Sequence, residues 1–283
     1  MKHFLGKAVP ELAFEPVPVR LRAYVGDVAA LDSLRSVLIW EPRRIVPVYA
    51  VPVSDIRGTI TPVDPQPAPP EEADLPRFLG PDSFEPHTTP GTVVDLAVDG
   101  RVLSRAGFVP GDPDLDDVVV LDFRPYDRWL AEDEVLVGHP HDPFKRIDVV
   151  RSRRHVEVSL DGSVLAATDD ALLLLETHLP PRYYLPPGDV DLARLSPSDS
   201  RSTCAYKGHA SYFSTSDGQA AGRDIAWTYP EPLDDALRVR DRIAFWNERT
   251  DIRVDGELQP RPVTPWSTPQ EQSTADVERL EFG

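Results

Sequence analysis

The chain has 283 residues but only one cysteine and one methionine. A single cysteine excludes an intrachain disulfide and a thiolate zinc cluster. Long apolar runs are also missing: the longest aliphatic stretch, residues 171–175, is far too short to cross a bilayer, and the first residues contain no apolar signal segment. These absences predict a cytoplasmic protein with no membrane partner, no structural metal and no cofactor.

Basic residues are scarce as well. Lys and Arg number 30 against 47 Asp and Glu, which gives a formal net charge of -17. A surface of this charge repels the phosphate backbone of nucleic acids, so no nucleic-acid partner is expected. The local basic run from Arg151 to Arg154 precedes an alternating segment, and we interpret it as the solvated start of a strand.

Stretches with helical periodicity are few, while prolines number 31. Because proline interrupts helices and central strands, the sequence predicts short strands joined by turns. The predicted fold is mainly β, with two tandem small antiparallel domains, long proline-rich connections and at most short helices. Strands are expected near residues 19–25, 37–40, 118–123, 155–160, 172–175 and 238–246, a hairpin turn at Asp161-Gly162, and one short helix near residues 126–134.

The two halves of the sequence resemble each other. At one constant offset Glu41 aligns with Glu176, and Tyr49 with Tyr184. Further along the chain, residues 99–100 align with residues 217–218 at a smaller constant offset. This pattern predicts a tandem duplication with an insertion in the first copy.

We place the first copy at residues 1–138 and the second at residues 139–283. The proline-rich insertion lies at about residues 58–91 and is expected to form an exposed loop that contains His87. A loosely ordered tail is expected from about residue 261. Duplication also suggests that the two copies pair within the chain as a pseudo-dimer.

The segment from Thr203 to Phe213 combines a thiol, an amine, an imidazole and phenols around one glycine. Charged groups are costly to bury without partners, so this composition indicates a positioned polar site. The candidate catalytic residues are Lys207, Glu176, Cys204 and His209. The candidate ligand-binding residues are Arg182, Tyr184, Tyr206, Gly208, Ser211 and Tyr212.

Three motifs in the second copy, residues 176–187, 204–212 and 226–230, look like those of the domain of unknown function 427 family, which is also labelled nucleotidyltransferase-like. The resemblance implies a mainly β, tent-like fold. The first copy is similar to the divergent amino-terminal repeat of tandem members, where the alignment places Pro86, Thr89 and Pro90 opposite Cys204, Lys207 and Gly208. Any activity that the family motif carries would therefore belong to the second copy.

Two other patterns contain the kinds of residue that bind metal ions. Nucleotidyl transfer needs a Gly-Ser turn near an Asp-x-Asp pair that holds metal ions, and residues 162–163 and 189–191 supply these pieces only at an unusually long separation. His139, His141 and Asp142 have the side chains of metal ligands, but the flanking prolines favour a strap between domains.

Three classes of function stay open. The second copy could bind a small polar or anionic molecule, or it could be an enzyme that uses Lys207 or Cys204 with Glu176 or His209. A structural or interaction protein is the third class, in which Glu176 forms an ion pair that only fixes a loop. A cavity shared by Glu176, Lys207 and Tyr184 would favour a site, whereas a closed ion pair beneath packed rings would favour the structural role.

Overall fold

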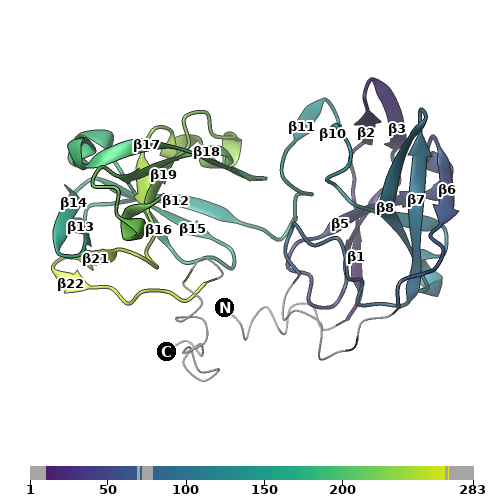
Figure 1. Cartoon of the computed structure of the whole chain (residues 1–283), viewed down its shortest axis with the longest axis horizontal. Coiled ribbons are helices and arrows are strands. Elements are labelled where there is room, and N and C mark those ends of the chain that lie inside the picture. Colours follow the sequence, from purple (N-terminus) through teal and green to yellow (C-terminus); the bar gives the residue numbers. More distant parts are fainter. Residues whose placement is uncertain (1–10, 69–70, 72–78, 265–266, 268–283) are drawn as a thin grey trace. The chain divides into compact units, whose positions relative to one another are not determined.

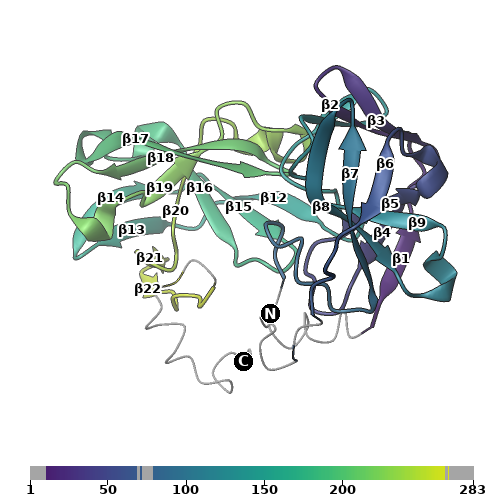
Figure 2. The ribbon, with the colours of Figure 1, turned by 45° about the vertical axis from the view of Figure 1, so that its right-hand side comes forward.

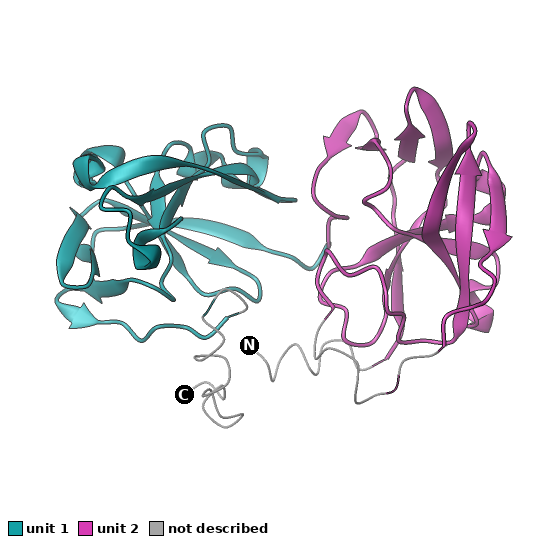
Figure 3. Cartoon of the chain, viewed as in Figure 1, with its two compact units in different colours: residues 1–2, 143–283 teal, residues 3–142 magenta. Residues whose placement is uncertain are grey.

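The structure is a computed structural model, and it describes residues 11–68, 71, 79–264 and 267. The described residues up to Asp142 form one compact unit, and those from Pro143 onward form another. Figure 3 colours these N-terminal and C-terminal units magenta and teal. Each unit contains one seven-stranded and one four-stranded sheet, both antiparallel. The prediction of a mainly β, antiparallel fold is confirmed.

The large sheet of the N-terminal unit has the order β1-β4-β5-β9-β8-β7-β6, and Figure 2 shows β8, β7 and β6 side by side. Its strands are β1 (Ala13–Pro16), β4 (Val37–Trp40), β5 (Val48–Pro52), β6 (Thr59–Pro62), β7 (Gly91–Val98), β8 (Arg101–Pro110) and β9 (Val118–Leu121). The small sheet, in the order β11-β10-β2-β3, consists of β2 (Leu21–Val25), β3 (Val28–Ser33), β10 (Arg128–Ala131) and β11 (Glu134–Leu136). Two short 3-10 helices, η1 (Val53–Asp55) and η2 (Pro113–Leu115), lie in its connections.

The large sheet of the C-terminal unit has the order β12-β15-β16-β20-β19-β18-β17 (Figure 1). Its strands are β12 (Ile147–Ser152), β15 (Ala171–Glu176), β16 (Arg182–Leu185), β17 (Leu195–Cys204), β18 (Gly208–Thr215), β19 (Ala226–Thr228) and β20 (Ile243–Phe245). The small sheet, in the order β14-β13-β21-β22, consists of β13 (Val156–Leu160), β14 (Ser163–Thr168), β21 (Asp251–Val254) and β22 (Glu257–Leu258). The 3-10 helices are η3 (Pro187–Asp189), η4 (Leu192–Arg194), η5 (Ala220–Gly222) and η6 (Asp234–Val239).

The strand order of the two units is the same, as a tandem repeat of one domain would produce. The strand registers shift the sequence alignment by one residue at Tyr49. Leu38 pairs with Tyr49 in the N-terminal unit, and Leu173 pairs with Tyr183 in the C-terminal unit. Tyr49 is thus equivalent to Tyr183 and not to Tyr184, because the chain from Leu38 to its partner Tyr49 is one residue longer than the chain from Leu173 to its partner Tyr183.

Each large sheet buries both of its faces. In the C-terminal unit one face packs against the small sheet through Leu185, Phe245 and Ile252. The other face carries Leu174, Tyr184 and Trp227 and is covered by residues that include Val239 of η6. The alternation of side chains along a strand sends neighbouring residues into these two cores, which explains why the central strands β16 and β20 are buried at nearly every position.

Two local expectations are corrected. The predicted helix near residues 126–134 is instead the hairpin of β10 and β11, because Trp129 pairs with Ala23 of β2 and its ring stacks on Phe123. The insertion in the first copy is not an exposed loop throughout. Its first residues form β6, and Leu79, Phe84 and His87 are all buried. Residues 69–70 and 72–78 of the insertion, and most of the predicted tail, lie outside the described residues.

Candidate functional site

The polar segment that the sequence singles out is a β-hairpin. Cys204 at the end of β17 pairs with Gly208 at the start of β18, and residues 205–207 form the turn. Gly208 has a φ of 88°, in the left-handed region where a side chain is strained, as in three-residue hairpin loops. The tip packs against residues 231–233, where the Leu233 amide donates to the Lys207 carbonyl at 3.2 Å. This packing directs the Lys207 side chain into the protein.

Inside the unit Lys207 meets Glu176, the last residue of β15. The Lys207 ammonium donates to Glu176 Oε2, and Lys145 Nζ lies 3.2 Å from Glu176 Oε1. Glu176 and Lys207 are only 9% and 7% exposed. One buried carboxylate is therefore held by two ammonium groups, a closed arrangement in which every charge has a partner.

Electrostatics keep this cluster ionised. Burial alone would raise the pKa of Glu176, but the charges of Lys207 and Lys145 outweigh it and hold that pKa below its usual value. Burial alone would lower the pKa of Lys207, but Glu176 outweighs it and the pKa is raised. A lysine that holds its proton this firmly is a poor nucleophile and a poor general base.

Aromatic rings pack beside the ion pair. Trp227 Nε1 donates to the Tyr184 hydroxyl at 3.1 Å, and the two rings meet edge to face with centroids 6.3 Å apart. Tyr184 is 1% exposed, and burial raises its pKa to about 12. Tyr206 in the hairpin tip is also buried, and Lys145 Nζ lies 5.8 Å from its ring centroid. These buried rings pack closely beside the ion pair.

Arg182 is engaged elsewhere. Its guanidinium forms two hydrogen bonds of 2.7 Å each to Glu248 and lies 5.2 Å from the ring centroid of Trp246. Thr264 donates to the same carboxylate at 2.7 Å. Neither Glu248 nor Lys145 was among the sequence-predicted residues, because nothing local marks a charge as the partner of a residue far along the chain.

The remaining predicted residues lie along β17 and β18 and do not converge. His209 Nδ1 lies 2.9 Å from Thr203 Oγ1 on the exposed side of the hairpin, and the Tyr212 hydroxyl lies 2.7 Å from Ser202 Oγ. Ser211 pairs with Thr228 of β19, and Cys204 is half-buried at the end of β17. The structure thus brings Glu176, Lys207 and Tyr184 together, and Cys204 is near enough to interact electrostatically with Lys207. Arg182 lies over the Trp227 ring but bonds to Glu248, and His209 lies on the exposed side of the hairpin.

The N-terminal unit buries the equivalent carboxylate, Glu41, with other partners. Arg44 Nη2 and His87 Nδ1 lie 3.1 and 3.0 Å from Glu41 Oε2. The Thr88 amide and the Thr89 hydroxyl donate to Oε1 at 2.9 and 3.1 Å. The alignment places Thr89 at the position of Lys207, while the strand registers place Thr88 there.

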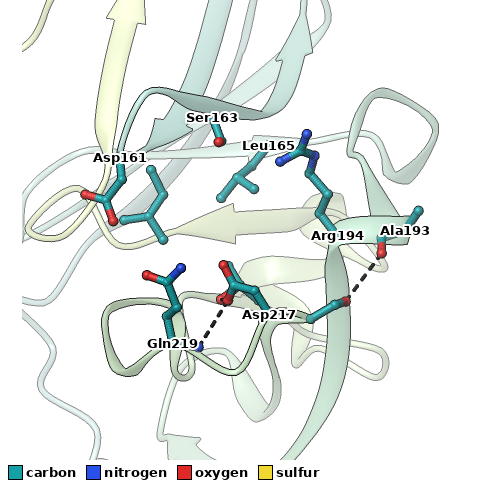
Figure 4. Close-up of a pocket in the computed structure, with 10 residues that line it drawn as sticks. Asp161, Ser163, Leu165, Ala193, Arg194, Asp217 and Gln219 are labelled. Atoms are coloured by element: carbon teal, nitrogen blue, oxygen red, sulfur yellow. Dashed lines mark hydrogen bonds between the residues drawn. The ribbon is translucent and has the colours of Figure 1, made fainter.

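A cleft of about 450 Å³ lies in another part of the C-terminal unit. Three separate segments enclose it: the turn and first residues of the β13–β14 hairpin, the end of η4, and the loop after β18. Figure 4 shows Ser163 and Arg194 on one side and Asp217 and Gln219 facing them. The lining residues are Leu160, Asp161, Ser163, Leu165, Ala193, Arg194, Thr215, Ser216, Asp217 and Gln219.

Carboxylates dominate the charge of this cleft. Asp161 and Asp217 line it, whereas Arg194, the one cationic side chain in the lining, already lies 3.2 Å from Asp191. Hydrogen bonds from Thr215 Oγ1 and the Gln219 amide lower the pKa of Asp217 and keep it ionised. The cleft is therefore suited to hydroxyl or ammonium groups more than to anions.

The pieces of a nucleotidyl-transfer site do not form a metal-binding pair. Asp161 and Gly162 have φ values of 50° and 79°, the hairpin turn that the sequence predicts. Asp189 accepts from Thr168 Oγ1 at 2.6 Å, while Asp191 pairs with Arg194. Within the described residues, no group of three or more His, Cys, Asp or Glu side chains is placed to hold a metal ion.

Comparison with protein families adds one finding. Residues 148–256 match the model described as a domain of unknown function (DUF427), from β12 to the end of β21. The C-terminal unit therefore contains a domain of this family, as its three motifs predict. A comparison with curated proteins found no match. No helix in the described part of the chain is long and apolar enough to cross a membrane.

Proposed function

We propose that the C-terminal unit binds a small polar molecule, rich in hydroxyl or amino groups, in the cleft between the β13–β14 hairpin, η4 and the loop after β18. The observation that carries this proposal is the cleft itself. Its volume of about 450 Å³ lies within the range of small-molecule sites, roughly 300–1,000 Å³. Its base is apolar at Leu165, and its rim presents donors and acceptors from Ser163, Arg194 and Gln219.

The charge of the lining narrows the ligand class. Asp161 and Asp217 together outweigh Arg194, so an anion would meet net repulsion at close range. Hydroxyl groups can donate to these carboxylates and accept from the Arg194 guanidinium and the side-chain amide of Gln219. A sugar-like or amino-bearing molecule satisfies both sets of groups, which argues for a polar ligand over the anionic one that the sequence left open.

Catalysis at Lys207 has less support than binding. Lys207 is held in its protonated form by the ionised Glu176, while Arg182 is paired with Glu248 and His209 is bonded to Thr203. We therefore assign Glu176 and Lys207 a structural role, that of anchoring the tip of the β17–β18 hairpin to the end of β15.

A thermal-shift screen of sugars, polyols, amino acids and nucleotides tests the proposal, since a ligand of the native state raises its melting temperature. Each hit is then titrated against Arg194→Ala and Gln219→Ala, which we expect to weaken binding by about tenfold each. Arg201→Ala is the matched control, because Arg201 is an exposed arginine whose guanidinium, among the described contacts, bonds only to nearby carbonyls of its own strand. Hits that bind all three variants equally, or a screen without hits, would contradict the proposal.

A further inference from the structure

Three arginines meet one aspartate at the end of the large sheet in the C-terminal unit. Asp170 lies in the turn between β14 and β15, and Arg242 Nη2 lies 3.1 Å from its Oδ2. Arg153 Nη1 and Arg151 Nη1 lie 3.2 and 3.8 Å from its Oδ1. One carboxylate therefore faces three guanidinium groups, and the cluster carries an excess of positive charge.

The neighbouring acidic residue does not remove this excess. Asp169 Oδ1 lies 2.8 Å from His155 Nδ1 and forms no ion pair with the three arginines among the described contacts. When Asp169 is counted with Asp170, three cations still stand against two anions. This local surplus of cations attracts an anion even though the chain as a whole has a formal net charge of -17.

The three arginines are held differently. Arg242 is largely buried and donates to the Asp170 carbonyl at 2.6 Å as well as to the carboxylate, so its guanidinium is occupied. The side chains of Arg151 and Arg153 are 55% and 68% exposed, and neither donates a hydrogen bond within the described part of the chain. Each guanidinium has five N–H donors, and those of Arg151 and Arg153 are available to an incoming ligand.

We propose that Arg151 and Arg153 form a binding site for a phosphate-type oxyanion, with Asp170 and Arg242 as positioning residues. Asp170 draws both exposed guanidinium groups toward one point, and Arg242 fixes Asp170 from the other side. Two guanidinium groups that approach from different segments, β12 and the connection to β13, can donate to several oxygens of one tetrahedral anion. This site differs from the acidic cleft in both its residues and its ligand.

The test is a titration of the full chain with inorganic phosphate at fixed ionic strength, followed through the Nε–Hε NMR signals of the arginines. Fixed ionic strength is needed because salt screens exposed charges. We expect saturable shifts at Arg151 and Arg153 with a dissociation constant on the order of 1 mM, and a loss of about tenfold for Arg151→Ala and for Arg153→Ala. Arg153→Lys, which keeps the charge but not the planar fork, should bind between Arg153→Ala and the natural chain.

Arg154→Ala is the matched control, because Arg154 adjoins the site and has the same exposure as Arg151, but pairs with Asp255 at 2.6 Å. Its affinity for phosphate should stay within about twofold of the natural chain. An equal loss in Arg154→Ala, or shifts that do not saturate by about 50 mM phosphate, would overturn the site. A second titration, with a phosphate monoester, distinguishes the two possible ligands. Tighter binding of the monoester than of inorganic phosphate indicates a phosphorylated small molecule, and equal binding indicates free phosphate.

Discussion

Each unit buries a glutamate at the equivalent place in its own large sheet, and the two units neutralise that glutamate in different ways. Glu176 relies on two lysines, one from the β17–β18 hairpin tip and one from the segment before β12. Glu41 relies on Arg44, three residues further along the chain, and on His87. Both units therefore have a buried carboxylate at this position, but the groups that pair with it differ.

The common requirement is electrostatic. Burial disfavours each carboxylate, yet the pKa of both Glu41 and Glu176 is lowered because their partners outweigh the loss of water. The Cys-Ala-Tyr-Lys-Gly-His motif thus supplies one of the two observed ways to neutralise the buried glutamate. The N-terminal unit lacks this motif, and there Arg44 and His87 lie against Glu41 instead.

The largest expected effect is that of Arg44→Met. Arg44 is 1% exposed and also donates to the Ser83 and Phe84 carbonyls at 2.6 and 2.8 Å, so its removal leaves Glu41 and two carbonyls short of donors. We expect the N-terminal unit to lose about 3–5 kcal/mol of unfolding free energy. Amide hydrogen exchange measures the unfolding free energy of each unit separately, and exchange in β15, which belongs to the C-terminal unit, should stay unchanged. A loss below about 1 kcal/mol would mean that His87 alone suffices.

A somewhat smaller effect is expected for Lys207→Met in the C-terminal unit. Lys145 remains 3.2 Å from Glu176, so one ammonium still faces the carboxylate. We expect a loss of about 2–4 kcal/mol, measured by denaturant unfolding with exchange as the probe of each unit.

The double variant Glu176→Met/Lys207→Met separates an ion pair from a reactive site. Replacing both partners of a buried pair by apolar side chains is often nearly neutral. Lys145 loses its carboxylate in this variant, but its ammonium is partly exposed and still donates to the Thr177 carbonyl at 2.9 Å, so most of the stability lost in Lys207→Met should return. If Lys207→Met instead leaves stability unchanged, the pair does not anchor the hairpin, and a chemical role for Lys207 would regain support.

Acid should weaken both units through these glutamates. A carboxyl group whose pKa is lowered by folding stabilises the protein above its unfolded pKa, about 4.5 for Glu, and that stability is lost as the pH falls through the lower folded value. Unfolding free energies measured from pH 7 downward should therefore fall below about pH 4.5 in both units. Glu176→Gln should flatten this fall in the C-terminal unit only, and an unaltered acid slope would contradict it.

Local signals in the sequence predicted much of the fold. The run Val37–Trp40 has the bounds of β4, and Asp161-Gly162 forms the predicted turn. The error at residues 126–134 arose because β10 pairs with β2, more than a hundred residues earlier, and the local pattern carries no trace of that pairing. The one-residue difference between Tyr183 and Tyr184 was likewise invisible until the strand registers were known.

The candidate site was less predictable for the same reason. Glu176 and Lys207 each stand out in the sequence because a charge interrupts an apolar pattern, and they do meet. Lys145 and Glu248 lie in unremarkable polar stretches, so only the three-dimensional structure connects them to the ion pairs. The cleft is built from three segments whose side chains are ordinary for turns, and its shape leaves no pattern along the chain.

The smallest expected effect concerns Thr89, which the sequence alignment, though not the strand register, places opposite Lys207. Thr89→Val removes one hydrogen bond of 3.1 Å to Glu41, while Arg44, His87 and the Thr88 amide remain in contact with the carboxylate. We expect the N-terminal unit to lose only about 1 kcal/mol, far less than Lys207→Met costs the C-terminal unit. Thr92→Val in β7 is the control, since its hydroxyl makes no hydrogen bond among the described contacts, and it should change stability by no more than about 0.5 kcal/mol. A loss from Thr89→Val as large as that from Arg44→Met would show that the threonine, and not the arginine, replaces the lysine of the second copy.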